Sequence, residues 1–216
     1  MINLNELTID LKECEKLLDG FKNLLDTSDE ISEGKADGLL KFFQSRPQLI
    51  ILIGKWRFAM DAKFYKPELN LFNEFRADFA VCDSKKKNFL FIEFEDARKN
   101  SVFSEITNEG TTRYEWASRF EHGFSQVLDW FYRLDDYSRT NKMEEHFGHS
   151  KIEYSGLLVI GRDKFIKEAG CESRLSWRKE KLMINNNPVH CITFDQLYLE
   201  LEEKLFTIQA DLAGYL

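Results

Sequence analysis

The chain is poor in proline, in paired cysteines and in glycine-rich motifs. Only three prolines occur in 216 residues, and the four cysteines are dispersed without a CxxC pair. A zinc knuckle is therefore not expected, and reduced thiols are. The sequence has no glycine-rich phosphate loop and no GxSxG elbow, so nucleotide hydrolysis and serine-hydrolase chemistry lack support, and no nucleotide cofactor is expected.

Long apolar runs and a surplus of positive charge are also missing. The longest apolar run, from Leu49 to Gly54, is far too short to span a bilayer. The first six residues show no basic region followed by an apolar one, so we expect no signal peptide, a cytoplasmic location and no membrane partner. The net charge of -7 argues against binding nucleic acid through overall charge, but it allows a local basic surface.

Apolar and aromatic residues are plentiful, at 43% and 14%, and they predict a packed core. The length suits one domain, residues 29–216, with an N-terminal helical extension, residues 1–28. The fold class expected is α/β (α+β), a mixed central β-sheet flanked by helices. Helices are predicted near 8–25, from a cap at Asp29 or Ser32 to about residue 46, and near 114–134, 163–183 and 195–208. Strands are predicted at 50–66 (one long strand or a bent pair), 75–82, 88–95, 152–161 and 189–194, and a loop at 100–112.

Two of these strands carry acids. Asp78 lies in the first, and Glu93 and Glu95 lie in the second, with the basic tip 84–87 between the strands. Side chains alternate along a strand, so Glu93 and Glu95 point to the same face, and a hairpin brings Asp78 beside them. Three converging acids repel each other unless a proton or cation intervenes. The pattern therefore predicts a site for Mg²⁺ (or Mn²⁺) and makes the chain a nuclease candidate.

Each of these residues also has a structural interpretation. Asp78 can pair with Arg76 or Arg57 across the sheet, and the two glutamates can form a solvated strand face. Gln126 can bond to buried main chain. Other groups also have both a functional and a structural interpretation. Glu121 is either catalytic or an ion-pair partner of Arg119 or Arg113, His146 and His149 are either a zinc pair or ordinary polar residues, and Trp116, Trp130 and Phe131 are either base-stacking platforms or part of the core. The basic residues form either a surface that binds phosphates or solvated charges, and they are Lys85–Lys87, Arg98, Lys99, Arg174, Arg178, Lys179 and Lys181.

Two motifs on either side of the predicted loop resemble a known family. Ile92-Glu93-Phe94-Glu95-Asp96-Ala97, followed by the segment from Arg119 to Trp130 with its Gly-Phe-Ser-Gln-x-x-Asp-Trp pattern, resembles the Shedu family of bacterial anti-phage defence proteins. The order of helices and strands resembles the PD-(D/E)XK nuclease superfamily, which implies a restriction-endonuclease-like core. The resemblance covers roughly residues 30 to 200.

The resemblance implies roles for individual residues. Asp78 and Glu93 would be the first and second metal-binding acids, and Glu95 stands where the usual motif has lysine. A glutamate there can bind metal, act as a base or mark a lost activity, and Arg98 or Lys99 would then supply the missing positive charge. Gln126 matches a glutamine that some nucleases of the superfamily use near the metal. Glu33, expected on the helix before the sheet, would be an additional metal-binding acid.

The function expected on these grounds is metal-dependent cleavage of DNA in bacterial anti-phage defence. DNA is the expected partner, and residues 8–25 are a candidate segment for forming a homo-oligomer. The alternative is a catalytically degenerate module of the nuclease fold that binds nucleic acid or a partner protein, and the missing lysine motivates it.

Overall fold

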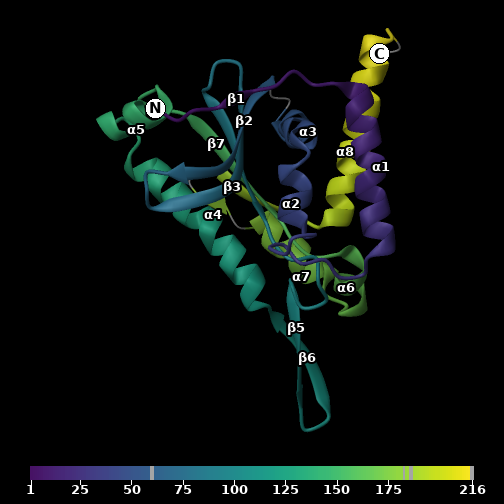
Figure 1. Ribbon diagram of the computed structural model, residues 1–216. Helices are drawn as coiled ribbons and strands as arrows, with labels where there is room; N and C mark the ends of the chain where they lie inside the picture. The colour runs from purple at the N-terminus through teal and green to yellow at the C-terminus, as the bar shows by residue number, and fades with distance from the viewer. Residues whose placement is uncertain (59–60, 182, 185–186, 215–216) are drawn as a thin grey trace.

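The computed structural model describes residues 1–58, 61–181, 183–184 and 187–214. A seven-stranded mixed sheet in the order β1-β2-β3-β4-β7-β9-β8 forms its centre (Figure 1). The pairs from β1 to β4 are antiparallel, β4, β7 and β9 run parallel, and β8 is antiparallel to β9. The strands are β1 Asn5–Glu6, β2 Ala62–Leu71, β3 Phe75–Asp83, β4 Asn88–Phe94, β7 Glu153–Val159, β8 Met183–Ile184 and β9 Asn187–Ile192.

Helices cover both faces of the sheet, and each face has its own apolar core. The core under α1, α2, α3 and α8 takes Leu90, Ile92 and Phe94 of β4. The core under α4, α5, α6 and α7 takes the alternate residues Phe89 and Phe91. The helices are α1 Leu11–Thr27, α2 Leu39–Gln44, α3 Pro47–Phe58, α4 Ser118–Asp136, α5 Asn141–Phe147, α6 Asp163–Glu168, α7 Glu172–Lys181 and α8 Phe194–Leu212. The prediction of a mixed sheet flanked by helices is confirmed.

The strand predicted over 50–66 is wrong in its first half. Residues from Pro47 to Phe58 form helix α3, and only the segment from Ala62 onward is a strand. Leu49 to Ile53 are all fully buried, so this helix shows no polar face that would reveal its period. Pro47 also suits the first position of a helix, where its missing N–H costs nothing.

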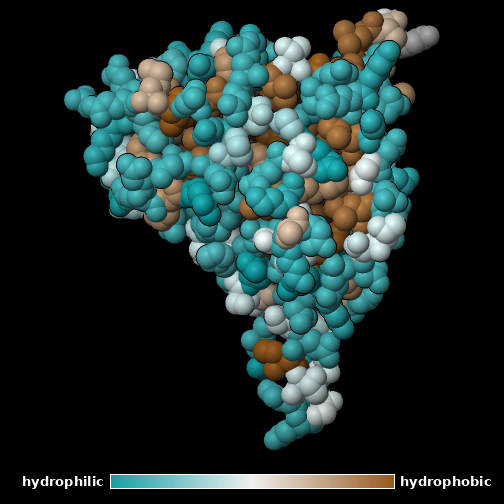
Figure 2. Space-filling view, viewed as in Figure 1, coloured by the Kyte–Doolittle hydropathy of each residue, from teal (hydrophilic) through white to brown (hydrophobic). Residues whose placement is uncertain are grey.

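The predicted loop at 100–112 is a hairpin arm. Strands β5 Phe103–Asn108 and β6 Thr111–Trp116 pair antiparallel and project away from the body (Figure 1). The arm is mostly hydrophilic or neutral on the face seen in Figure 2. As a result α4 begins at Ser118, after the end of the arm, and not at Tyr114 as predicted. The helix predicted over 163–183 is likewise interrupted, since α6 ends at Glu168 and α7 begins at Glu172.

Helix α1 packs its apolar face into the body of the protein. Cys14, Leu18, Phe21 and Leu25 are buried in the same core as α3 and α8. Asp10 caps the helix by accepting hydrogen bonds from the backbone N–H groups of Lys12 and Glu13, at 3.0 and 3.1 Å. The domain boundary at residue 28 and the oligomer expected through residues 8–25 stay predictions. Within the described residues, no helix combines the length and apolar character needed to cross a membrane.

Candidate active site

The two acid-bearing strands meet as the sequence predicts. β3 and β4 form an antiparallel hairpin in which Phe79 lies opposite Ile92. Asp78 directly precedes Phe79 in the chain, and its Oδ2 accepts a hydrogen bond from the backbone N–H of Phe94, at 2.8 Å. Asp78 therefore lies beside the Glu93–Glu95 segment. It does not pair with Arg76, whose guanidinium lies 3.6 Å from Glu68, and the side chain of Arg57 lies outside the described part.

Glu93 faces helix α4 and is almost fully buried. Its Oε1 accepts a hydrogen bond from the side-chain amide of Gln126 on that helix. Its Oε2 is buried and has no hydrogen-bond partner among the described residues. An unpaired buried carboxylate oxygen is costly unless a proton or a cation satisfies it. Gln126 thus contacts a predicted metal ligand instead of buried main chain.

Glu95 is buried to 1% exposure, and Arg119 of α4 is its charged partner. Arg119 Nη1 lies 3.1 Å from Glu95 Oε2, and the same guanidinium lies 3.3 Å from Asp96 and 3.6 Å from Glu33. A single arginine therefore faces three acids. The Arg119 side chain as a whole is 42% exposed, so part of it remains accessible to a ligand from solvent.

Glu33 reaches the cluster from a bend before α2, not from a helix as predicted. The buried Asp96 holds this segment in place. Its Oδ1 accepts the backbone N–H of Glu33 at 2.7 Å, and the backbone of Ile31 pairs with that of Ala97. The site thus draws on three segments of the chain: the bend at Glu33, the β3–β4 hairpin and the start of α4.

The electrostatics of the cluster favour protonated acids. Burial raises the pKa of Glu93 to about 10, with further increases from Asp78 and Glu95, while Gln126 opposes the shift. Burial raises the pKa of Asp78 to about 7 against the Phe94 N–H bond, and that of Glu95 to about 8 against Arg119. Burial also raises the pKa of Glu33. These carboxyl groups need protons, or a cation that replaces them, to be stable together.

The type of donor fits a hard divalent cation, because carboxylate oxygens are the ligands that Mg²⁺ and Mn²⁺ prefer. Glu93 Oε2 adds an unpartnered oxygen inside the cluster. In the described chain, however, no three His, Cys, Asp or Glu side chains are arranged as a finished metal site. Instead, Asp78 is turned toward the backbone N–H of Phe94, and Glu95 is turned toward Arg119. Metal binding would therefore require side-chain rotation within the cluster.

Gly123 lets α4 approach the cluster closely. A Cβ atom at this position would lie 2.9 Å from Cγ of Glu95 and 2.8 Å from Cδ1 of Leu158. By contrast, a Cβ on Gly20 in α1 would meet no atom within 4 Å. We expect Gly123→Ala to be less stable than Gly20→Ala by about 1–3 kcal/mol, the usual cost of overpacking, because both changes gain the same helix propensity. Urea unfolding of the two variants measures the difference, and equal stabilities would contradict the close approach.

Arg119 is the site residue that the sequence prediction missed. It was considered only as a partner of Glu121, which instead forms a bidentate ion pair with Arg178, at 2.6 and 2.8 Å. Arg98 lies 3.7 Å from Asp96, whereas Lys99 pairs with Glu105. A helical face carrying Arg119, Gly123 and Gln126 at positions i, i+4 and i+7 was the available signal.

The two histidines weighed as a zinc pair or as ordinary polar residues bond to the main chain. His146 Nε2 lies 3.1 Å from the carbonyl oxygen of Asn70, and His149 Nε2 lies 3.1 Å from that of Lys85. Both imidazoles therefore bond to the main chain of separate segments. Trp130 and Phe131 are buried in the core, as the structural interpretation predicted, whereas Trp116 is only partly buried.

The fold and the site define a mixed α/β domain that gathers acids from three segments, together with Arg119, at the open end of its central hairpin. The chain belongs to the family described as Shedu protein SduA, C-terminal, which matches residues 35–198. No curated protein matches the chain. Family membership suggests a role in anti-phage defence, and the matched segment contains Asp78, Glu93, Glu95, Arg119 and Gln126.

Proposed function

We propose that this chain is a Mg²⁺- or Mn²⁺-dependent nuclease that cleaves DNA phosphodiester bonds, with a restriction-endonuclease-like (PD-(D/E)XK) core. The observation that carries the proposal is the buried, unpartnered Glu93 Oε2 in a cluster of acids with raised pKa values. A divalent cation can replace the protons that hold such a cluster together. A bound divalent metal would supply an activated water and compensate the charge that grows on the phosphate.

The residues of the chain have distinct tasks in this proposal. Asp78 and Glu93 hold the metal, with Glu95 and Glu33 as further oxygen donors. Gln126 fixes one carboxylate oxygen of Glu93 by its hydrogen bond and so leaves the other free for the ion. This positioning matters because a ligand displaced by even a fraction of an ångström loses much of its effect.

Arg119 takes the electrostatic task that lysine has in the usual motif. Its guanidinium lies at the acid cluster and its side chain is partly exposed, so it can donate to a phosphate oxygen. Glu95, which stands at the lysine position, forms an ion pair with Arg119 and holds it against the cluster. A positive charge is thus present at the site, although it comes from α4 and not from β4.

The test is calorimetric titration of Mn²⁺ into the wild-type protein, followed by addition of supercoiled plasmid with and without the metal. Metal binding together with metal-dependent nicking is the expected result. Metal binding without nicking at any metal concentration would contradict the catalytic assignment while leaving the metal site in place.

A second candidate is a catalytically degenerate module that binds nucleic acid or a partner protein. The ion pair of Glu95 with Arg119, and the absence of a finished three-ligand site in the described residues, favour it. In that case the acids are structural and stay protonated or paired. Absence of Mn²⁺ binding, with unchanged partner binding by Glu95→Ala, is the result that separates this candidate from the nuclease.

A further inference from the structure

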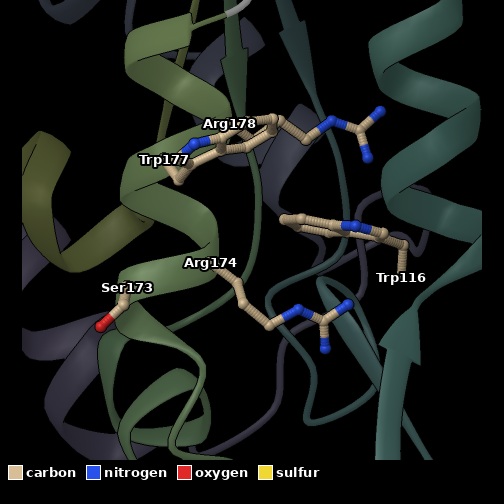
Figure 3. A pocket seen from close by; sticks show the side chains of 5 residues that line it. All are labelled: Trp116, Ser173, Arg174, Trp177 and Arg178. Carbon is tan, nitrogen blue, oxygen red and sulfur yellow. The ribbon is translucent and has the colours of Figure 1, made fainter.

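A second candidate site lies between α7 and the base of the hairpin arm. A cavity of about 590 Å³ is lined there by Trp116, Ser173, Arg174, Trp177 and Arg178 (Figure 3). Its volume is within the usual range for small-molecule sites. None of its lining residues belongs to the acid cluster, and the proposed nuclease chemistry uses none of them.

The two tryptophans of the cavity differ in what they offer. Trp116 packs against Phe103 and Phe120, at 4.5 and 4.8 Å between ring centroids, and the guanidinium carbons of Arg174 and Arg178 lie 5.3 and 4.7 Å from its ring centroid (Figure 3), so its faces are occupied. Trp177 is 61% exposed, and no aromatic ring packs on it among the described residues. Figure 3 shows the Trp177 indole at the cavity, on the same side of Trp116 as Arg178. A flat ligand thus finds a free ring face on Trp177 and the edge of Trp116 as a wall.

The two arginines determine the charge of the ligand. Arg178 is neutralised by its bidentate pair with Glu121. Arg174 donates to the carbonyl oxygen of Tyr114 at 2.7 Å and has no carboxylate partner among the described residues. Arg174 therefore retains a full positive charge at the cavity. This charge disfavours an ammonium ligand and favours a phosphate.

The ligand that meets these demands is flat, aromatic and singly anionic, like one nucleotide of a nucleic acid strand. A nucleotide di- or triphosphate is a poorer match, because its phosphates usually require a glycine-rich loop and the chain has none. Paired bases in a duplex are also a poorer match. Neighbouring bases cover their faces, whereas stacking on Trp177 requires a base with a free face. Single strands are commonly held by aromatic stacking combined with arginine contacts to the backbone.

We propose that this cavity binds an unpaired nucleotide of single-stranded nucleic acid, with its base stacked on Trp177 and its phosphate on Arg174. The site is separate from the acid cluster, although both contact the first turns of α4. Arg119, Gly123 and Gln126 face the acids, whereas Phe120, Glu121 and Phe124 face Arg178. Binding here does not depend on cleavage at the acids.

The test is fluorescence anisotropy with labelled oligo(dT), oligo(rU) and a blunt duplex, in EDTA and at low salt so that nothing is cut. The wild-type protein is expected to bind a single strand more tightly than the duplex, and the tighter of the two single strands shows whether the DNA or the RNA oligomer is preferred. We expect Trp177→Ala to weaken this binding by about tenfold, as loss of one stacked base does, and Trp177→Phe to retain most of it. Arg174→Gln should weaken binding and reduce its dependence on salt by about one phosphate contact.

Phe206→Ala is the matched control, because it removes an aromatic ring that is 70% exposed on α8, outside the cavity. Glu153→Gln, which changes an exposed acid on β7 outside both sites, is a second control that should bind as the wild type does. Binding is measured in EDTA, so loss of the nuclease proposal leaves this one standing. The inference is overturned if Trp177→Ala binds like the wild type, if Phe206→Ala loses as much, or if no single strand binds. Equally strong competition by free thymidine monophosphate would assign the cavity to a free nucleotide instead.

Discussion

Asp78→Ala and Glu93→Ala are each expected to abolish Mn²⁺-dependent plasmid nicking while the fold remains intact. Both carboxylates are proposed metal ligands, and Glu93 carries one of the two cluster oxygens that lack a hydrogen-bond partner among the described residues, the other being Oε2 of Glu95. Changes to groups that merely support metal ligands already cost about 10- to 100-fold in affinity or activity, so loss of a ligand should cost at least a hundredfold. Nicking rates at saturating Mn²⁺, with circular dichroism for the fold, measure the effect.

The conservative variants Asp78→Asn and Glu93→Gln separate chemistry from packing. Asp78→Asn keeps an oxygen for the Phe94 N–H, and Glu93→Gln keeps an oxygen for Gln126. Glu153→Gln removes an exposed acid from β7 at the far end of the sheet and should nick like the wild type. Undiminished nicking by both conservative variants would sink the assignment of these acids as ligands.

Stability of the wild-type protein should fall as pH rises from about 5 to about 10, and Glu93→Gln should reduce this loss most. The pKa of Glu93 is raised to about 10, that of Glu95 to about 8 and that of Asp78 to about 7. Unfolded carboxyl groups titrate near 4, so above that pH the folded state binds more protons than the unfolded state. For each extra proton that the folded state holds, the free energy of unfolding falls by about 1.4 kcal/mol for every unit by which the pH rises, until the pH passes the pKa of that group in the folded state.

Because the pKa of Glu93 is raised furthest, its contribution extends across the widest pH window. Glu93→Gln carries no ionisable group there, so it should be more stable than the wild type near pH 9 and should differ least near pH 5. Urea unfolding across this range measures both curves. Identical pH dependence in the two proteins would show that Glu93 is ionised in the folded state.

Mn²⁺ offers a second readout of the same linkage. A cation that replaces the protons should stabilise the wild-type protein more at pH 9 than at pH 6, because fewer protons must then be released on binding. The stabilisation should be weak in Glu93→Gln at both pH values. A metal effect of equal size in both proteins would place the cation elsewhere.

The site was predictable where local pattern determined it. Asp78, Glu93 and Glu95 stand on adjacent strands joined by a short basic turn, and period-two alternation placed the two glutamates on one face. The contact of Gln126 with Glu93 was expected only through the family resemblance. The position of Glu33 was anticipated, but its element was wrong, because a bend held by Asp96 carries no periodic signal of its own.

The fold was less predictable where every side chain is buried. Leu49 to Ile53 are uniformly apolar in α3, and a uniform run has neither a period of two nor one of 3.6. The polar segment before Trp116 was equally ambiguous. Among the residues that the structure describes, its strands pair only with each other, so more than half of their residues are exposed, and their composition resembles that of a loop.

The sequence alone determined the acid-bearing hairpin, the amphipathic helix α4, the buried strand β7 and the family, because each depends on neighbours close in the chain. Only the tertiary structure decided the partners of the charges. Arg119 meets Glu95, Asp96 and Glu33, and Arg178 meets Glu121 across a separation of 57 residues. Charged side chains are long and have many candidate partners, so the fold decides which charges meet. The Trp177 cavity arises in the same way, where α7 and the hairpin arm come together.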